Sequence, residues 1–320
     1  MKKIISIILV AMLAISLTAC GVQKQDGKVR IGILQFVNHP SVDNITQGVK
    51  DGLASLGYND SNAIIDFQIA NADSAVANTI ATKFVADKCD VIVAVTTGAA
   101  QAAYNVTRGT DIPVVFVAVS DPIGAGVVES SEKPNTNVTG VSDLLDVDSA
   151  IGLVKTLLPQ AKTIGVVYSS GEANAVKEAE LLKAKALKEG LNFESETISS
   201  TADVPLAMDA ILSKNVDVIV NTLDNTLVSA LNVELDKANA KNIPVIGSTS
   251  EQVSSGCLGS DSFDQFDVGG EAAPIIDRVI KGESPNDIPV INCTKTKMVV
   301  NKKVAEKFSI SIPEGASIIE

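Results

Sequence analysis

Two short polar motifs have residue types that suit a small charged ligand. Thr96, Thr97 and Gly98 stand where an apolar run ends and a helical run begins. Their hydroxyls and the free N–H groups of a helix start can bind a carboxylate, although a threonine there can also simply cap its helix. Asp224 and Asn225 occupy the equivalent turn later in the chain, where an aspartate can accept from an ammonium group or cap the helix. Together the motifs favour a zwitterion, with donors on one wall and an acid on the other.

Further polar residues follow predicted strands or lie on segments that connect the two halves of the chain. Asp121 follows a strand, where it can border a cleft or form a plain turn. Asp143 and Asp261 lie on the predicted connections, where each can contact a ligand or fix a hinge. Gln35 ends the first predicted strand and by position faces the same cleft. The one histidine, His39, has no second His or Cys nearby and is interpreted as a solvated loop or helix-start residue, not a catalyst.

Composition and motifs argue against catalysis, metal binding and nucleic-acid binding. The sequence has no GxSxG, HExxH or P-loop motif, and a single histidine excludes His-rich metal sites. The 38 acidic residues outnumber the 26 basic ones and give a net charge of −12, which does not suit a phosphate backbone. Tryptophan is absent and aromatic residues make up 3%, which disfavours a base-stacking groove. We expect a protein that is not an enzyme and has no metal, no cofactor and no nucleic-acid partner.

Short apolar runs that alternate with helical runs must position these residues. Near-continuous apolar strands separated by amphipathic helices predict a parallel sheet that is covered on both faces. In the first half the predicted strands are Val29–Phe36, Ile64–Ile69, Asp90–Val95 and Pro113–Val119, and the predicted helices are Ser41–Leu56, Ser74–Lys88 and Gly98–Arg108. Ligands of such sheets bind beyond the carboxyl ends of the strands, which is where the polar motifs fall.

The second half of the chain repeats this pattern. TIGVVY (163–168) resembles VRIGIL (29–34), while DVIV and IPV each occur twice, all in the same order and about 130 residues apart. This order predicts two similar α/β lobes with a ligand site between them. Several crossings between the lobes form a hinge. The expected boundaries are 29–141 with about 262–284 for the N-terminal lobe, and 142–261 with about 285–320 for the C-terminal lobe.

The N-terminus has the features of a targeting signal. Lys2 and Lys3 precede an apolar stretch that is shorter than a spanning helix, and Leu17-Thr18-Ala19-Cys20 follows. The latter motif resembles a bacterial lipobox, which implies that residues 1–19 are removed and that Cys20 carries lipid; an uncleaved anchor or an ordinary signal peptide are the alternatives. Residues 20–28 then form a tether to the membrane. The remaining cysteines allow one disulfide at most and are interpreted as small buried apolar residues: Cys89, Cys257 and Cys293.

Several longer motifs occur in a known family. They are IGILQFVNHP (31–40), VAVTTGAAQAA (93–103), PVVFVAVSDPIGAGVV (113–128), NVTGVSD (137–143) and DNT (224–226). From about residue 29 to 313, the chain resembles bacterial ABC-transporter substrate-binding lipoproteins of the type I periplasmic-binding fold. Within that family it is similar to the branch associated with uptake of tryptophan, tyrosine and phenylalanine. Related members often have Thr-Pro-Thr at the position of Thr96-Thr97-Gly98.

The resemblance implies a function and a set of ligand contacts. An extracytoplasmic, lipid-anchored monomer captures an amino acid by hinge closure and delivers it to a membrane permease with its ATPase. The implied ligand contacts are Gln35, Thr96, Thr97, Asp121, Asp143, Asp224, Asn225 and Asp261. From their chemistry, we expect the threonines to bind the carboxylate and Asp224, with Asp261, to bind the ammonium. The alternatives are a binding lipoprotein for a nucleoside or another small polar solute, and a sensor or an enzyme with the same fold.

Overall fold

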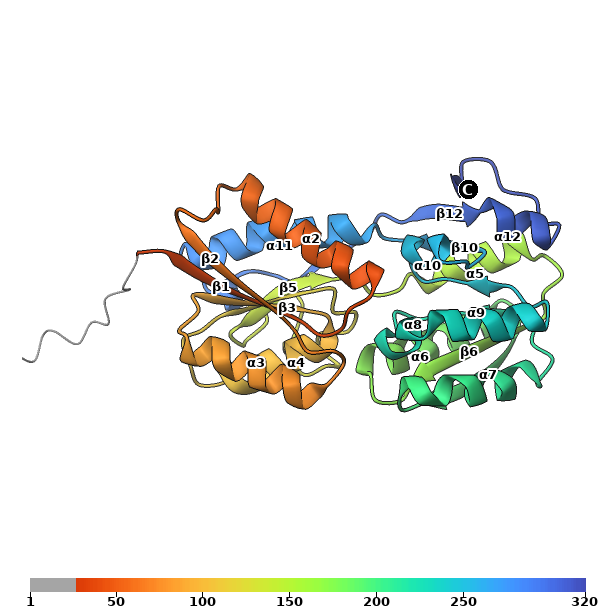
Figure 1. The fold of residues 1–320 in the computed structure, drawn as a ribbon, viewed down its shortest axis with the longest axis horizontal. Helices are drawn as coiled ribbons and strands as arrows, with labels where there is room; N and C mark the ends of the chain where they lie inside the picture. The colour runs from red at the N-terminus through yellow and green to blue at the C-terminus, as the bar shows by residue number, and fades with distance from the viewer. Residues whose placement is uncertain (1–26) are drawn as a thin grey trace, which may run out of the picture.

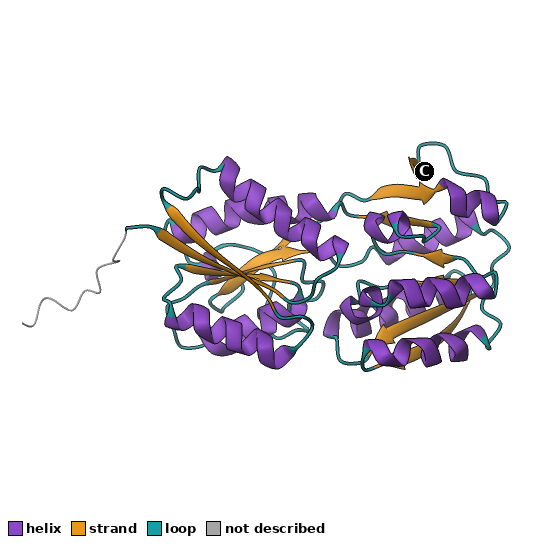
Figure 2. Cartoon of the chain, in the orientation of Figure 1, coloured by secondary structure: helices purple, strands orange, loops and turns teal. Residues whose placement is uncertain are grey.

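The fold consists of two α/β lobes that lie side by side (Figure 1). It is described by a computed structural model over residues 27–320. The predicted signal peptide, Cys20 and the tether up to residue 26 lie outside the described residues. Each lobe has strands in the middle and helices on both sides (Figure 2). The predicted fold class, two similar lobes that each contain a largely parallel sheet flanked by helices, is confirmed.

The first lobe contains a six-stranded sheet in the order β11-β5-β4-β3-β1-β2, and all of its strand pairs are parallel. Its strands are β1 (Val29–Gln35), β2 (Ala63–Ile69), β3 (Val91–Val95), β4 (Val114–Val117), β5 (Val138–Ser142) and β11 (Ile291–Asn292). Its helices are α2 (Pro40–Ser55), α3 (Ser74–Ala86), α4 (Thr97–Thr107) and α11 (Gln265–Ile280), with the 3-10 turn η2 (Pro285–Asp287). In Figure 1, α2 and α11 cover one face, and α3 and α4 cover the other. Every residue of β3, β4 and β5 is buried, as expected for strands covered on both faces.

The second lobe contains a seven-stranded sheet in the order β13-β12-β10-β9-β8-β6-β7. Its strands are β6 (Thr163–Ser169), β7 (Asn192–Ile198), β8 (Val218–Val220), β9 (Val245–Ile246), β10 (Gly259–Ser262), β12 (Lys297–Asn301) and β13 (Ser317–Ile319). Its helices are α5 (Val147–Leu157), α6 (Ala173–Lys188), α7 (Val204–Leu212), α8 (Asn225–Ser229), α9 (Leu231–Ala240), α10 (Ser250–Ser254) and α12 (Lys302–Lys307), with the 3-10 turn η1 (Thr201–Asp203). The strand order β2-β1-β3-β4-β5 of the first lobe recurs here as β7-β6-β8-β9-β10, which is the predicted repeat. The pair β10–β12 is antiparallel.

Within residues 27–320 the chain passes from one sheet to the other three times: after β5, after β10 and after β11. The short strand β11 pairs with β5 of the first sheet. Ile288 and Val290, which precede it, are buried in the core of the first lobe. The last return to the second lobe therefore falls between Asn292 and Lys297, later than the boundary near residue 285 expected from the sequence. The apolar side chains of this segment hold it on the first lobe.

A close contact between α2 and α11 ties the first lobe together. A Cβ atom at Gly48 of α2 would overlap the carbonyl oxygen of Phe266, and one at Gly269 of α11 would overlap that of Ile45. Glycine at both positions therefore lets the two helix backbones approach each other directly. Since α11 begins just after a crossing from the second lobe, this contact fixes α2 relative to the hinge.

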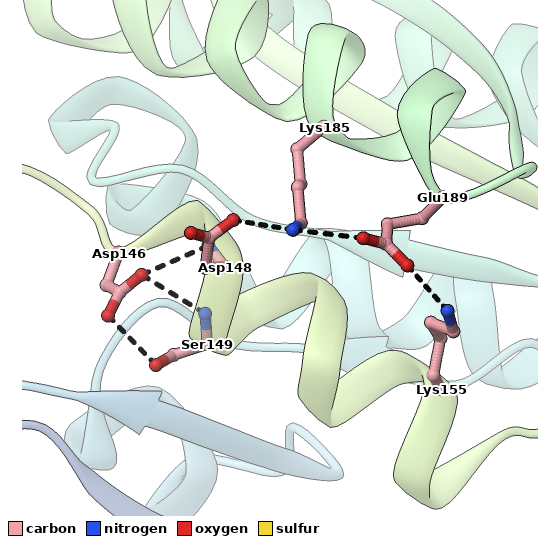
Figure 3. A network of polar contacts seen from close by, with 6 residues as sticks. All are labelled: Asp146, Asp148, Ser149, Lys155, Lys185 and Glu189. Carbon is pink, nitrogen blue, oxygen red and sulfur yellow. Dashed lines mark hydrogen bonds and ion pairs between the residues drawn. The ribbon is translucent and has the colours of Figure 1, made fainter.

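A network of charged side chains joins α5 and α6 on the second lobe (Figure 3). Asp146 caps α5 by accepting from the N–H groups of Asp148 (3.0 Å) and Ser149 (3.1 Å). Lys185 of α6 pairs with Asp148 (2.7 Å) and Glu189 (3.1 Å), and Glu189 also pairs with Lys155 of α5 (2.6 Å). Such exposed pairs add little stability individually. The network aligns α5, which follows the first crossing, with α6, whose first turns reach the space between the lobes.

Candidate functional site

A cavity lies between the two lobes. The first lobe contributes the start of α2, the β3–α4 turn and the residues that follow β4 and β5. The second lobe contributes the starts of α6, α8 and α10, and α11 contributes its first residue. The lining residues are His39, Ser41, Val42, Ile45, Thr96, Thr97, Ala118, Ser120, Asp143, Asn174, Leu223, Asp224, Asn225, Val228, Thr249, Gln252 and Gln265. The cavity thus lies beyond the carboxyl ends of both sets of strands, as in other open parallel sheets.

Side chains from the two lobes hydrogen-bond to each other around this cavity. Nε2 of His39 lies 3.4 Å from Oδ1 of Asn225, and Oγ of Ser41 lies 2.9 Å from Oγ1 of Thr249. Further out, the Asn44 amide donates to Glu251 over 2.8 Å. These contacts join the start of α2 to α8 and α10. The structure therefore has its lobes closed.

The β3–α4 turn brings a strained, unpartnered hydroxyl to the cavity. Thr96 is 5% exposed and has φ 76°, a left-handed conformation that is costly for a β-branched residue. Its Oγ1 has no hydrogen-bond partner among the described residues. Thr97 is the first residue of α4, whose free N–H groups begin here. A Cβ at Gly98 would lie 2.7 Å from the Phe36 ring, so close packing explains glycine at this position.

On the second lobe, the cavity is lined by hydrogen-bond acceptors. Asp224 is fully buried and caps α8 by accepting from the Leu227 N–H (2.8 Å), while its other oxygen accepts from the Ser169 N–H. Burial, and then the charge of Glu172, raise the pKa of Asp224. Asn174 donates its amide N–H to the carbonyl of Leu223 (2.7 Å), which leaves its Oδ1 without a partner among residues 27–320. Two acceptors, one of them a carboxyl group, therefore flank the same part of the cavity.

Glu172 organises this wall although it does not line the cavity. Its carboxylate accepts from the backbone N–H and the side-chain amide of Asn225, at 3.1 and 2.7 Å. It also accepts from the backbone N–H and the hydroxyl of Thr226, at 2.8 and 2.6 Å. Glu172 is not among the predicted site residues, since an acidic residue at the start of a charged helix is usually solvated. Four donors at one carboxylate fix the first turn of α8.

A second buried carboxyl pair lies at the hinge. Asp143 lines the cavity on the first crossing segment, 3.4 Å from the Ser120 hydroxyl, and burial raises its pKa to about 6. Glu178 of α6 is fully buried and accepts from the Leu223 N–H (2.7 Å). Burial raises the pKa of Glu178 to about 8, and the nearby Asp143 adds to this rise. These two acids connect the first crossing to the binding wall of the second lobe.

Five of the eight predicted contacts meet at the cavity: Thr96, Thr97, Asp143, Asp224 and Asn225.

The other three predicted contacts do not line the cavity. The Gln35 amide donates to Asp43 (2.7 Å) and to the Val37 carbonyl and accepts from Thr46 (2.6 Å), so it supports α2. Asp121 closes its own turn by accepting from the Gly124 N–H (2.8 Å). Asp261 lies within β10, opposite Met298 of β12.

Part of the lining comes from residues that were not predicted as ligand contacts. His39 is a helix-start residue, as one of the two interpretations expected, but it is buried at the N-cap of α2 and it reaches the other lobe. Asn174 and Gln252 come from helix starts of the second lobe. Helix starts that follow strands were an available signal for these residues. Which of their side chains face the cavity depends on how the lobes meet, and the sequence pattern does not contain that information.

Three further observations concern metal clusters, cysteines and membrane-spanning helices. Among residues 27–320, no cluster of three or more His, Cys, Asp or Glu side chains is arranged to hold a metal ion. Cys89, Cys257 and Cys293 are unpaired. In the same part of the chain, no helix combines the length and the apolar character needed to cross a membrane.

Comparison with known proteins places this architecture in a class. The two lobes, the repeated strand order and the interlobe cavity are those of type I periplasmic binding proteins. Residues 30–319 match the family described as ABC transporter substrate binding protein. A tyrosine-binding protein of Clostridioides difficile is 39% identical over 315 residues, covering 94% of this chain and 90% of the relative. The chain therefore belongs to the ABC transporter substrate-binding protein family, whose members bind substrates for import outside the cytoplasm.

Two solved structures allow the arrangement of the lobes to be compared. An ABC domain from Streptococcus pneumonia in complex with L-Trp is 38% identical, with a TM-score of 0.88 and coverage of 91% of this chain and 100% of that one. A ligand-free, open substrate binding protein with adhesive properties from Clostridium difficile is 35% identical, with a TM-score of 0.71 and coverage of 91% and 99%. At similar identity, the structure is closer to the tryptophan complex than to the open form. This agrees with the hydrogen bonds across the cavity.

Proposed function

We propose that the protein captures a free aromatic L-amino acid in the interlobe cavity and delivers it to an ABC permease. The observation that carries this proposal is that donors on one wall of the cavity face acceptors on the other wall. On one lobe stand the unpartnered Thr96 hydroxyl and the start of α4, and on the other stand Asn174 Oδ1 and the Asp224 carboxyl. Donors opposite acceptors complement the carboxylate and ammonium groups of an amino acid. Relatives that bind tyrosine and L-Trp support the same ligand class.

The charged ends of the ligand have defined partners in this proposal. Thr96 and Thr97 bind the carboxylate together with the N–H groups that begin α4. Asn174 and Asp224 bind the ammonium, and the ammonium charge favours the ionised form of Asp224. Burial of both ligand charges is tolerable because each meets a partner of opposite character inside the closed cavity.

The side chain of the ligand is placed in the aliphatic part of the cavity. Val42 and Ile45 of α2, Ala118 after β4, and Val228 of α8 line the cavity. Aliphatic walls of this kind can bury an aromatic ring. Among the described residues, no Phe, Tyr or Trp lines the cavity, which argues against the alternative of a nucleoside held by base stacking.

Binding works through hinge closure in this account. The ligand enters between open lobes, contacts one wall, and is then enclosed when the other wall moves in. A ligand shifts this equilibrium only if it binds the closed form more tightly, and contacts to both lobes provide that difference. We further propose that the mature protein is a monomer anchored by lipid on Cys20, which keeps the loaded protein at high effective concentration near its permease.

Native mass spectrometry tests the proposed function. Residues 27–320, which contain both sheets and their cores, are purified, and any bound solute is released by unfolding and identified. An aromatic amino acid at one-to-one stoichiometry supports the proposal. A nucleoside or a sugar contradicts the zwitterion site. If the protein is purified empty, a thermal-shift series with the free amino acids decides, and a series without any stabilisation rejects the proposal.

A further inference from the structure

His39 has one ring nitrogen that the protein uses and one that it does not. Its side chain is 9% exposed, lines the cavity and stands at the N-cap of α2. Nε2 lies 3.4 Å from Oδ1 of Asn225 on the other lobe. Nδ1 is buried and has no hydrogen-bond partner among the described residues. A buried nitrogen without a partner is costly, so a group that enters the cavity and satisfies it gains affinity.

The chemical character of that free nitrogen follows from a chain of contacts. Glu172 accepts from the amide nitrogen of Asn225 at 2.7 Å, so this nitrogen faces Glu172 and Oδ1 faces His39. An amide oxygen only accepts, so Nε2 of His39 must carry the hydrogen. Burial lowers the pKa of His39 and keeps the ring neutral near pH 7. Nδ1 therefore has a bare lone pair and requires a donor.

The position of His39 indicates which part of the ligand meets it. Val42 follows His39 by one helical turn, and Val228 follows Asn225 by one turn on the other lobe. The His39–Asn225 pair therefore lies at the end of the aliphatic part of the cavity, which is assigned above to the ligand's ring. The ammonium already has Asn174 and Asp224 on the second lobe. The donor left for Nδ1 is one on the ring.

We infer that His39 is a specificity-determining residue whose Nδ1 accepts a hydrogen bond from the phenol O–H or indole N–H of the ligand. This inference rests on the proposed function and narrows it. The site then selects aromatic amino acids that carry a ring donor, tyrosine and tryptophan, over phenylalanine. Discrimination arises because phenylalanine leaves the buried nitrogen unpaired.

Matched ligand pairs test this inference on the unaltered protein. Affinities of residues 27–320 are measured by calorimetry for L-tyrosine against L-phenylalanine, and for L-tryptophan against 3-benzothienyl-L-alanine, which has sulfur in place of the N–H. We expect the ligand with the donor to bind about tenfold more tightly in at least one pair. Equal affinities within both pairs overturn the inference. Failure of all four ligands to bind rejects the proposed function itself, and the inference with it.

Two substitutions then separate the roles of the two nitrogens. In His39→Gln, the side-chain amide reaches the position of Nε2 but places no acceptor at the position of Nδ1. In His39→Asn, the shorter amide keeps an acceptor near the position of Nδ1 but no longer reaches Asn225. We expect His39→Gln to remove the tenfold preference for the ligand that carries the ring donor. His39→Asn should weaken all four ligands alike and keep the preference. Equal losses for all four ligands in His39→Gln would overturn the inference, because His39 would then act on closure alone. Thermal unfolding confirms that each variant is folded.

Discussion

A single side chain of the binding wall can stabilise the fold and also line the cavity. Asp224 caps α8 and accepts from the Ser169 N–H, yet it also lines the cavity. Its removal therefore affects both the fold and the ligand. Thr96 differs, because its hydroxyl has no partner among residues 27–320 and its loss costs the empty protein nothing in hydrogen bonds. The two residues call for different substitutions.

Asp224→Ala is expected to weaken amino-acid binding by roughly 2–5 kcal/mol, the range for removing one partner of a buried charge pair. Asp224→Asn keeps an oxygen that can cap α8, but it loses the charge and the acceptor for the Ser169 N–H. Most of the loss in affinity should therefore remain, and stability should be restored only in part. Calorimetry gives the affinity and thermal unfolding gives the stability. Unchanged affinity in both variants would exclude Asp224 as the ammonium partner.

Thr96→Val is expected to weaken binding by about 1.5–3 kcal/mol, the usual contribution of a hydrogen bond to a charged group. Valine keeps the β-branched shape at the strained position, so the melting temperature should hardly change. Thr79→Val is the matched control, since its exposed hydroxyl bonds only to the Ala75 carbonyl far from the cavity. If Thr96→Val binds like the wild type, the carboxylate lies elsewhere.

Site residues were predictable where local chemistry alone selects them. Thr96 and Asp224 end strands and begin helices, and that position already indicates a cleft. Gln35 and Asp121 meet the same criterion, but their polar groups serve α2 and a turn. Glu172 and His39 were not predicted as site residues because their partners come from α8, whose contacts depend on tertiary packing. A polar residue near a strand end is thus a candidate, and its partners decide its role.

At the scale of elements, the contact between α2 and α11 holds much of the site in place. It involves backbone atoms at Gly48 and Gly269, and α2 carries His39, Val42 and Ile45 to the cavity. Larger side chains at these glycines would separate the helices. The start of α2 would then move away from α8 and α10.

We predict that Gly48→Ala or Gly269→Ala lowers the free energy of unfolding by about 1–3 kcal/mol, since the added methyl group overlaps a backbone carbonyl. Gly270→Ala is the matched control on α11, because nothing lies within 4 Å of its added Cβ. It should be neutral or stabilise by up to about 1 kcal/mol, because alanine favours a helix. Urea denaturation measures all three variants. A stable Gly48→Ala protein would contradict the close contact.

Most strands of the first lobe were predictable because their own apolar runs define them. β3 and β4 are fully buried, and so are the last five residues of β1, all near the expected positions. The two-residue strand β11 had no such signal, because both of its residues are exposed and its pairing depends on β5. The short helices α8 and α10 likewise depend on caps from Asp224 and Thr249.

At the scale of the whole molecule, buried acids lie close to each other at the hinge. Asp143 belongs to the first crossing and Glu178 to the second lobe, and their charges influence each other. Ser120 of the first lobe hydrogen-bonds to Asp143. The folded state therefore retains a proton on Glu178 at neutral pH that an unfolded chain would release.

This arrangement predicts a pH dependence of stability. The pKa of Glu178 rises from 4.5 to about 8 on folding, so its contribution is fully present below pH 4.5 and is lost as the pH rises through about 8. We expect the free energy of unfolding to fall between pH 5 and 8, by at most about 1.4 kcal/mol per pH unit for this group. Glu178→Gln should flatten the curve. Urea denaturation at several pH values measures it, and identical slopes in both proteins would contradict the assignment.

The central claim is that the closed lobes hold one aromatic amino acid between the β3–α4 turn and the second-lobe acceptors. A crystal structure grown with L-tryptophan tests this claim most directly. The account predicts the carboxylate at Thr96 and Thr97, the ammonium at Asn174 and Asp224, and the ring between Val42 and Val228. An empty interlobe cavity at saturating tryptophan, or a ligand in the reverse orientation, would contradict it.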